Sequence, residues 1–100
     1  MKPYVFRHTK YSIVYHYTGR KQTQEHYYMD KEKALQDMRE QERKINKIKA
    51  HIDDDQKSIY VDKTDTKILY FHYLNDNGYK AKKDLIKEPI ILLEVEEVNK

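Results

Sequence analysis

The segment from Asp30 to Ile52 constrains the fold of this chain most, because it contains neither glycine nor proline and is typical of one long α-helix. Its apolar side chains recur at intervals of three and four residues: Leu35, Met38, Ile45, Ile48 and Ile52. This spacing places them in one stripe, which we expect to cover the core. Asp30 can cap the helix, because its carboxylate can accept a hydrogen bond from a free backbone N–H.

Polar residues interrupt the stripe, since Gln41 and Glu42 occupy inward positions between Met38 and Ile45. We therefore expect the middle of the helix to be held less tightly than its ends. The helix should measure about 33 Å, against about 23 Å for a strand of seven residues. One end of the helix is then expected to extend beyond the sheet, carrying the basic residues Arg43, Lys44, Lys47 and Lys49.

The segments on both sides of the helix are typical of β-strands, because short runs rich in tyrosine and β-branched residues alternate with turn residues. We predict strands over residues 4–8, 11–17, 23–29, 58–62, 67–74, 79–83 and 90–98. The order β-β-β-α-β-β-β-β indicates an α+β fold, a two-layer sandwich of one long helix on a mainly antiparallel, twisted sheet. A chain of 100 residues should form a single domain, residues 1–100.

The first hairpin is expected to turn at Gly19, which joins the strand over 11–17 to the strand over 23–29. Two loops are compatible with this turn: a three-residue loop from Gly19 to Lys21, and a two-residue loop of Gly19 and Arg20. The two differ by one residue in register. Such a shift would move His26 and Tyr28 from the outer face of the sheet to the inner face.

Three further signals organise the second half of the chain. Lys63-Thr64-Asp65 should close a second hairpin, and Asn75-Asp76-Asn77-Gly78 is the best turn signal in the chain. The strand over 79–83 would be a polar edge strand, because its lysines discourage pairing with another chain. Glu88-Pro89 should interrupt the chain before the last strand.

One helix can cover only one face of the sheet. If the more apolar alternate positions face the helix, the core comprises Tyr11, Ile13, Tyr15, Ile59, Val61, Leu69, Phe71, Ile91, Leu93 and Val95. The outer face would then present Val14, His16, His26, Tyr28, Tyr60, Tyr70 and His72. Tyrosine is common at wet protein interfaces, which favours a binding face. Tyrosine is also a good strand former that tolerates a solvated sheet face.

Composition excludes several classes of protein. The chain has no cysteine, and therefore neither a disulfide framework nor a thiolate metal site. With only two glycines, a glycine-rich nucleotide cradle is not expected. No run approaches the roughly 20 apolar residues of a membrane span, and no apolar signal-peptide segment follows the first residues. We therefore expect a cytoplasmic protein.

Clusters of polar residues do not form a recognised chemical motif. His16, His26 and His72 could approach one another on the sheet, but they lack the close spacing of zinc ligands. The run Asp53-Asp54-Asp55 lacks the glycine and glutamate of a calcium loop, so we expect a solvated loop. There is no nucleophile with its base and no paired carboxylates. We expect a protein without catalytic activity, metal or cofactor.

The remaining hypothesis is a small protein-binding module, a modulator or inhibitor of a larger protein, of the accessory kind that mobile elements and phages carry. The candidate binding residues are His16, His26, Tyr28, Tyr60, Tyr70, His72, Arg20, Lys21, Arg43 and Lys47. The alternative is a nucleic-acid-binding module, because the aromatic N-terminal hairpin carries Arg7, His8, Lys10, Arg20 and Lys21. A net charge of +3 is too small to decide between them. A homodimer through the outer face or an edge strand is a further hypothesis.

Overall fold

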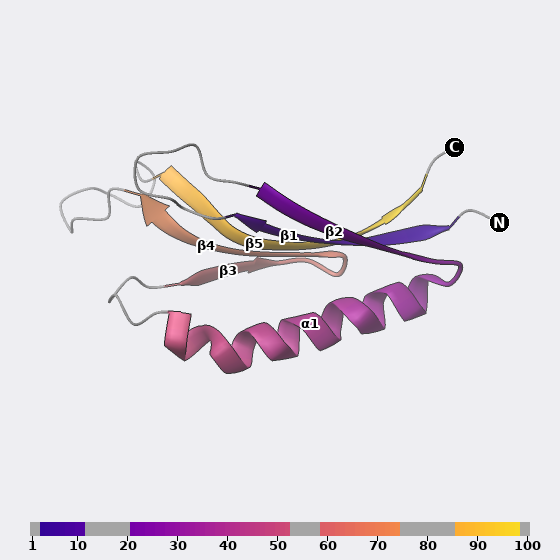
Figure 1. The fold of residues 1–100 in the computed structure, drawn as a ribbon, viewed down its shortest axis with the longest axis horizontal. Coiled ribbons are helices and arrows are strands. Elements are labelled where there is room, and N and C mark those ends of the chain that lie inside the picture. The colour runs from indigo at the N-terminus through magenta and orange to yellow at the C-terminus, as the bar shows by residue number, and fades with distance from the viewer. Residues whose placement is uncertain (1–2, 12–20, 53–58, 75–85, 99–100) are drawn as a thin grey trace.

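The computed structural model describes residues 3–11, 21–52, 59–74 and 86–98. The elements in chain order are β1 (Tyr4–Tyr11), β2 (Lys21–Tyr28), α1 (Lys31–Ile52), β3 (Tyr60–Lys63), β4 (Lys67–Leu74) and β5 (Ile86–Glu97). The strands form one antiparallel sheet in the order β2-β1-β5-β4-β3, and α1 lies against one of its faces (Figure 1). The predicted α+β class, with one long helix on an antiparallel sheet, is confirmed. The strands predicted over 11–17 and 79–83 lie outside the described residues, apart from Tyr11.

The amino end of α1 forms as the sequence predicts. The Asp30 side chain accepts a hydrogen bond from the Glu32 backbone N–H at 3.0 Å. The Asp30 carbonyl accepts the first helical bond from the Ala34 N–H at 3.3 Å. The side-chain bond satisfies one of the four donors that the first turn of a helix otherwise leaves free, and the carbonyl bond begins the regular helical series. The apolar stripe then reaches the core through Leu35, which is buried against the sheet.

The stripe is buried at Met38 and Ile45 but exposed at Ile48, and the side chain of Ile52 lies outside the described part of the chain. Met38 is 2% exposed and Ile45 is 5% exposed, but Ile48 is 50% exposed. We expected one end of α1 to extend beyond the sheet. Instead, α1 runs along the length of the sheet (Figure 1). The expectation was wrong because it assumed seven-residue strands. β5 has 12 residues and is about 40 Å long, which exceeds the length of the helix.

Three polar side chains on α1 hold the helix to different strands. The Tyr28 hydroxyl on β2 donates a hydrogen bond to Asp37. Glu42 forms an ion pair with Lys63 of β3, with 2.8 Å between Oε2 and Nζ. The Tyr70 hydroxyl on β4 donates to Asn46 Oδ1 at 3.0 Å. Glu42 interrupts the apolar stripe, yet it bonds the middle of the helix to the sheet.

The first hairpin differs from the prediction. β2 pairs with β1, from Tyr4 opposite Tyr28 to Tyr11 opposite Lys21, whereas its predicted partner was the strand over 11–17. This pairing sets Phe6 opposite His26, and their rings stack with centroids 6.4 Å apart. The register between two strands is set by which side chains must be buried on one face of the sheet. Here it places Phe6 and His26, with Tyr4 and Tyr28, together on the side of the helix.

Strand β4 also differs from the predicted orientation. Leu69 and Phe71 were expected to face the helix, but the alternate residues Ile68 and Tyr70 do so. Because β4 is apolar at both sets of alternate positions, its sequence pattern cannot specify the face. Tyr70 can be buried because its hydroxyl reaches Asn46. The predicted inward positions of β5 are confirmed, and they are Ile91, Leu93 and Val95.

Pro89 does not interrupt the last strand, contrary to our expectation. β5 starts at Ile86 and runs through Pro89, where its register with β4 shifts by one residue. Proline is tolerated at a bulge or on an edge, since it lacks an N–H to donate. The pairing of β1 with β5 starts only at Ile91, so within the described residues Pro89 pairs with β4 alone.

The predicted hairpin around Lys63-Thr64-Asp65 is confirmed, and Thr64 N–H donates to the Lys67 carbonyl at 2.7 Å.

Candidate functional site

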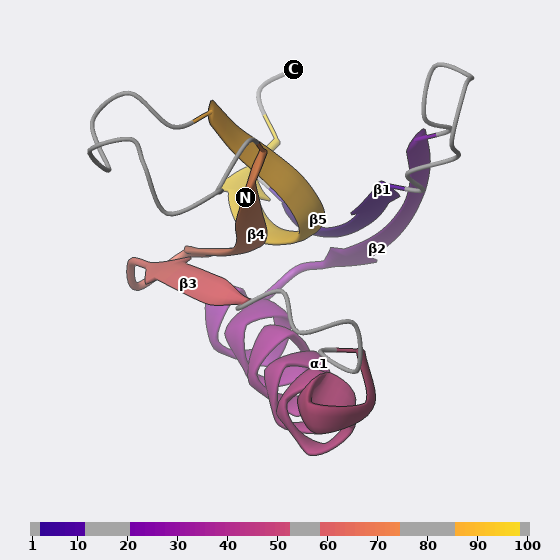
Figure 2. The same cartoon turned by 90° about the vertical axis from the view of Figure 1, so that its left-hand side faces the viewer.

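The face of the sheet opposite α1 is the candidate functional site, and we call it the open face. No element within the described ranges packs on it, and the curvature of the sheet is visible in Figure 2. Its central residues come from four strands: Val5, Arg7 and Thr9 of β1, Thr23, Glu25 and Tyr27 of β2, Lys67, Leu69, Phe71 and Tyr73 of β4, and Lys87, Leu92, Glu94 and Glu96 of β5. Tyr60 and Asp62 of β3 extend it.

The middle of the open face is apolar. Leu69 lies opposite Leu92, and both side chains remain partly exposed. Val5 is 0% exposed and Phe71 is 2% exposed, although neither belongs to the core beneath the helix. A sheet with one solvated face normally alternates apolar and polar residues, whereas a sheet covered on both faces does not. β4, and β5 around Leu92, therefore have the pattern of strands that are covered on both faces.

An aromatic cluster adjoins this apolar middle. The Phe71 ring stacks on Tyr60, with centroids 5.8 Å apart, and Tyr73 meets both rings edge-on at 5.4 and 5.0 Å. Lys87 Nζ lies 4.8 Å from the Phe71 ring centroid and 2.9 Å from Asp62 Oδ2. The hydrogen bond to Asp62 raises the pKa of the Lys87 amine. The cluster thus joins apolar rings to a charged rim.

A charged cluster on Arg7 adjoins the other side of the apolar middle. The Arg7 guanidinium bonds Glu96, lies 3.1 Å from Glu25 through Nε, and lies 3.7 Å from Glu94 through Nη1. The hydrogen bond to Glu96 raises the pKa of Arg7, and the same bond lowers the pKa of Glu96. One cation faces three carboxylates, so this end of the open face is acidic.

The edge of this cluster includes Tyr27. Its hydroxyl donates to Glu25 Oε2 at 2.7 Å, and this bond, with the Arg7 bond, lowers the pKa of Glu25. The Glu25 carboxylate in turn raises the pKa of Tyr27. Tyr27 is 61% exposed, so its ring is available to a partner. Arginine and tyrosine are both enriched at protein interfaces.

The predicted binding residues do not gather on the open face. Tyr60 lies on it, as predicted. His26, Tyr28, Tyr70 and His72 lie on the side of the helix, for the reasons of pairing and orientation given above. His16 and Arg20 lie outside the described residues. Lys21 is exposed at the start of β2, with its Nζ 5.8 Å from the Tyr11 ring centroid.

The residues on the helix side serve packing. Bonding to Asp37 raises the pKa of Tyr28 to about 12, and burial raises that of Tyr70 to about 12. His72 Nε2 lies 3.4 Å from Glu88, and this contact becomes an ion pair only when the imidazole is protonated. His26 and His72 lie on β2 and β4, with β1 and β5 between them. The sheet therefore does not bring these two histidines together.

Sequence reasoning missed that His8 is half-buried. Its Nε2 is buried without a hydrogen-bond partner, and the residue lies between β2 and β5 on the side of the helix. Burial lowers the pKa of His8, nearby Lys10 and His26 lower it further, and Asp37 raises it. A neutral imidazole is therefore favoured in the fold. His8, one of the residues of the hypothesised nucleic-acid interface, therefore lies on the helix side of the sheet and not on the open face.

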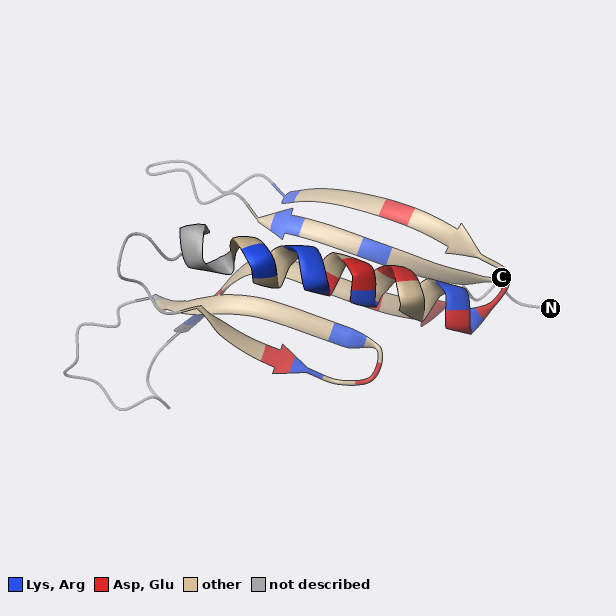
Figure 3. Ribbon diagram, turned by 90° about the horizontal axis from the view of Figure 1, so that it is seen from below, with Lys and Arg blue, Asp and Glu red and all other residues tan. Residues whose placement is uncertain are grey.

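Lys and Arg positions recur along α1 (Figure 3), and the predicted Arg43 and Lys47 belong to this helix. Both are exposed, as are Arg39 and Lys44. Arg43 forms an ion pair with Glu40 one turn earlier. Acidic residues are mixed among the basic ones in the amino half of the helix. An exposed pair of this kind contributes little to stability, and the surface is that of an ordinary solvated helix.

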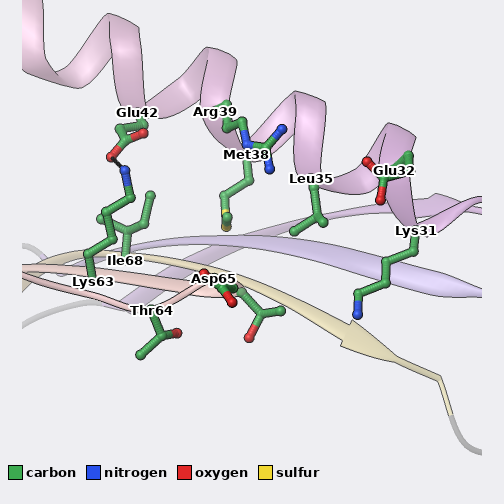
Figure 4. A pocket seen from close by; sticks show the side chains of 11 residues that line it. Lys31, Glu32, Leu35, Met38, Arg39, Glu42, Lys63, Thr64, Asp65 and Ile68 are labelled. Atoms are coloured by element: carbon green, nitrogen blue, oxygen red, sulfur yellow. Dashed lines mark ion pairs between the residues drawn. The ribbon is translucent and has the colours of Figure 1, made fainter.

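A groove separates α1 from the turn between β3 and β4, with a volume of about 470 Å³ (Figure 4). Leu35, Met38 and Ile68 form its floor, and the Glu42–Lys63 ion pair crosses it. The floor residues are buried, so little apolar surface faces the groove. Its rim mixes both charges, from Lys31, Glu32, Arg39 and Asp65. The groove therefore has no chemistry that favours one class of ligand.

Comparisons with protein families, characterised proteins and solved structures found no significant match. In the described part of the chain, no group of three or more histidine, aspartate or glutamate side chains is arranged to hold a metal ion. Nor does any helix there combine the length and the apolar character needed to cross a membrane.

Proposed function

We propose that this protein is a small, non-enzymatic, cytoplasmic protein-binding module that modulates or inhibits a larger protein by covering part of its surface with the open face. The observation that carries the proposal is that β4, and β5 at Leu92, present apolar side chains on both faces, while α1 covers only one of them. Apolar surface exposed to water is unfavourable at about 25 cal/mol per Å². A partner that covers Leu69 and Leu92 would remove this cost.

The surroundings of the apolar middle favour a protein partner. Protein interfaces combine an apolar centre with a polar rim. Here the rim is the Arg7 cluster on one side and the Lys87–Asp62 pair on the other. A partner with an apolar patch beside a basic residue would match the surplus carboxylates around Arg7. The alternative, a nucleic acid, is disfavoured on this face because Arg7 is already paired and the surrounding carboxylates repel phosphate.

Site-specific photo-crosslinking tests the proposal in the cell that produces the protein. A crosslinking side chain at Lys67, which is exposed on β4 beside Leu69, should give one discrete protein adduct. The matched position is Lys33, which is exposed on α1 and should give none. Adducts from Lys33 alone, or from neither position, would contradict the use of the open face.

With the captured partner purified, Leu69→Gln should weaken binding by about tenfold, or about 1.4 kcal/mol, because it places an amide in the apolar middle. Lys33→Gln should leave the affinity unchanged. Circular dichroism would show that both variants are folded. Affinity that Leu69→Gln does not change, or that falls steeply with salt on a nucleic acid, would favour the alternative.

A further inference from the structure

β2 is an outer strand of the sheet, and within the described residues it pairs only with β1. Seven of its eight residues are exposed. Because pairing groups alternate along an antiparallel strand, every second residue directs its N–H and C=O outward, away from β1. β2 contains no proline, and its register with β1 is continuous. The outer strand on the other side, β3, has only four residues. β2 therefore lacks the bulge, proline or short length that usually protects an edge.

The charges on β2 are arranged to match a second copy of the same strand. Lys21 and Glu25 are its only Lys, Arg, Asp or Glu residues, and they lie four positions apart on the open face. Lys21 Nζ lies over the Tyr11 ring, and Glu25 accepts the Arg7 and Tyr27 bonds on the same side. In an antiparallel pair centred on Thr23, Lys21 lies opposite Glu25 of the partner subunit.

We propose that two copies of this chain pair through β2, antiparallel and edge to edge, into one continuous sheet. Centring the pair on Thr23 forms the Lys21–Glu25 contact twice, because the two-fold axis repeats it. Centring the pair on Gln24 keeps these charges diagonal neighbours. Centring it on Glu25 would oppose the carboxylates of the two subunits and is disfavoured. The strand thus matches itself in a narrow set of registers.

In this dimer, the two helices lie on one side and the two open faces on the other. The two-fold axis of an antiparallel edge pair is perpendicular to the sheet, so both α1 helices lie on one side of the dimer. The open faces of both copies then join on the other side. The proposal stands independently of the proposed function, because it uses the edge of β2 and leaves the middle of the open face uncovered.

Analytical ultracentrifugation of the full chain across a dilution series tests the proposal. The protein should change from monomer to dimer as its concentration rises. Lys21→Glu should raise the dissociation constant by roughly tenfold or more, because it opposes carboxylates at two symmetric contacts. Lys44→Glu makes the same change of charge on the exposed surface of α1 and should leave the dissociation constant unchanged.

Hydrogen exchange identifies the surface through which any dimer forms. The outward-facing amides of β2 should exchange quickly in dilute protein and slowly in concentrated protein, whereas those of Lys21→Glu should exchange quickly at both concentrations. A monomer at every concentration would overturn the proposal. So would a dimer whose β2 amides remain unprotected, since it would use another surface.

Discussion

Met38→Ala should lower the free energy of unfolding by about 2–5 kcal/mol, the range for large-to-small changes of buried aliphatic residues. Met38 is 2% exposed and lies in the core beneath α1 with Phe6, Ile68 and Leu93. Its removal would leave a cavity between the helix and the central strands. Urea unfolding followed by circular dichroism measures the change.

Ile48→Ala is the matched control on the same helix. The sequence stripe includes both residues, but Ile48 is 50% exposed in the structure. Its substitution should change stability by no more than about 0.5 kcal/mol, as for most surface positions. Equal losses for the two variants would show that Ile48 is packed against the sheet as tightly as Met38, contrary to the structure.

Phe71→Ala should lower the free energy of unfolding by about 3–5 kcal/mol, even though Phe71 lies on the face opposite the helix. The ring is 2% exposed and contacts Tyr60 and Tyr73, with Lys87 above it. The substitution would remove the centre of the aromatic cluster. Thermal and urea unfolding would both report the loss.

Val61→Ala provides the comparison for Phe71. Val61 lies on the neighbouring strand β3 and is 39% exposed, so truncating its side chain should cost much less. If Phe71→Ala cost no more than Val61→Ala, the aromatic cluster would contribute nothing to the fold. The open face would then be a solvated surface rather than a packed one.

The helix could be predicted from the sequence because its signals are local. A capping aspartate, an uninterrupted run without glycine or proline, and an apolar stripe all lie within Asp30–Ile52. The antiparallel hairpin of β3 and β4 was predicted for the same reason, since its strands are separated by a short turn. Such features depend on neighbouring residues and need no knowledge of distant contacts.

The partner of β2 and the orientation of β4 could not be predicted, because both depend on distant residues. β1 pairs with β5 from the far end of the chain, and β5 in turn sets the face of β4. Alternation does not choose a face when Leu69 and Tyr70 are both apolar. The Arg7 cluster was missed for a similar reason, since its three glutamates lie on β2 and β5.

One sequence signal could have indicated the open face. The runs over 67–74 and 90–95 are apolar at nearly every position, which is typical of strands covered on both sides. The sequence prediction instead gives one set of alternate positions to the core and makes the other an aromatic surface. With a single helix available, the same runs predict a second apolar face that needs a cover.

The central claim is that this second apolar face is open in the full chain, and solvent accessibility measured by NMR tests it most directly. A soluble paramagnetic chelate enhances the relaxation of methyl groups that it can approach. We predict several-fold stronger enhancement for Leu69 and Leu92, which are partly exposed on the open face, than for Ile68 and Leu93, which lie beneath α1. Equally weak enhancement of all four residues would show that the chain covers both faces itself, and it would contradict the claim.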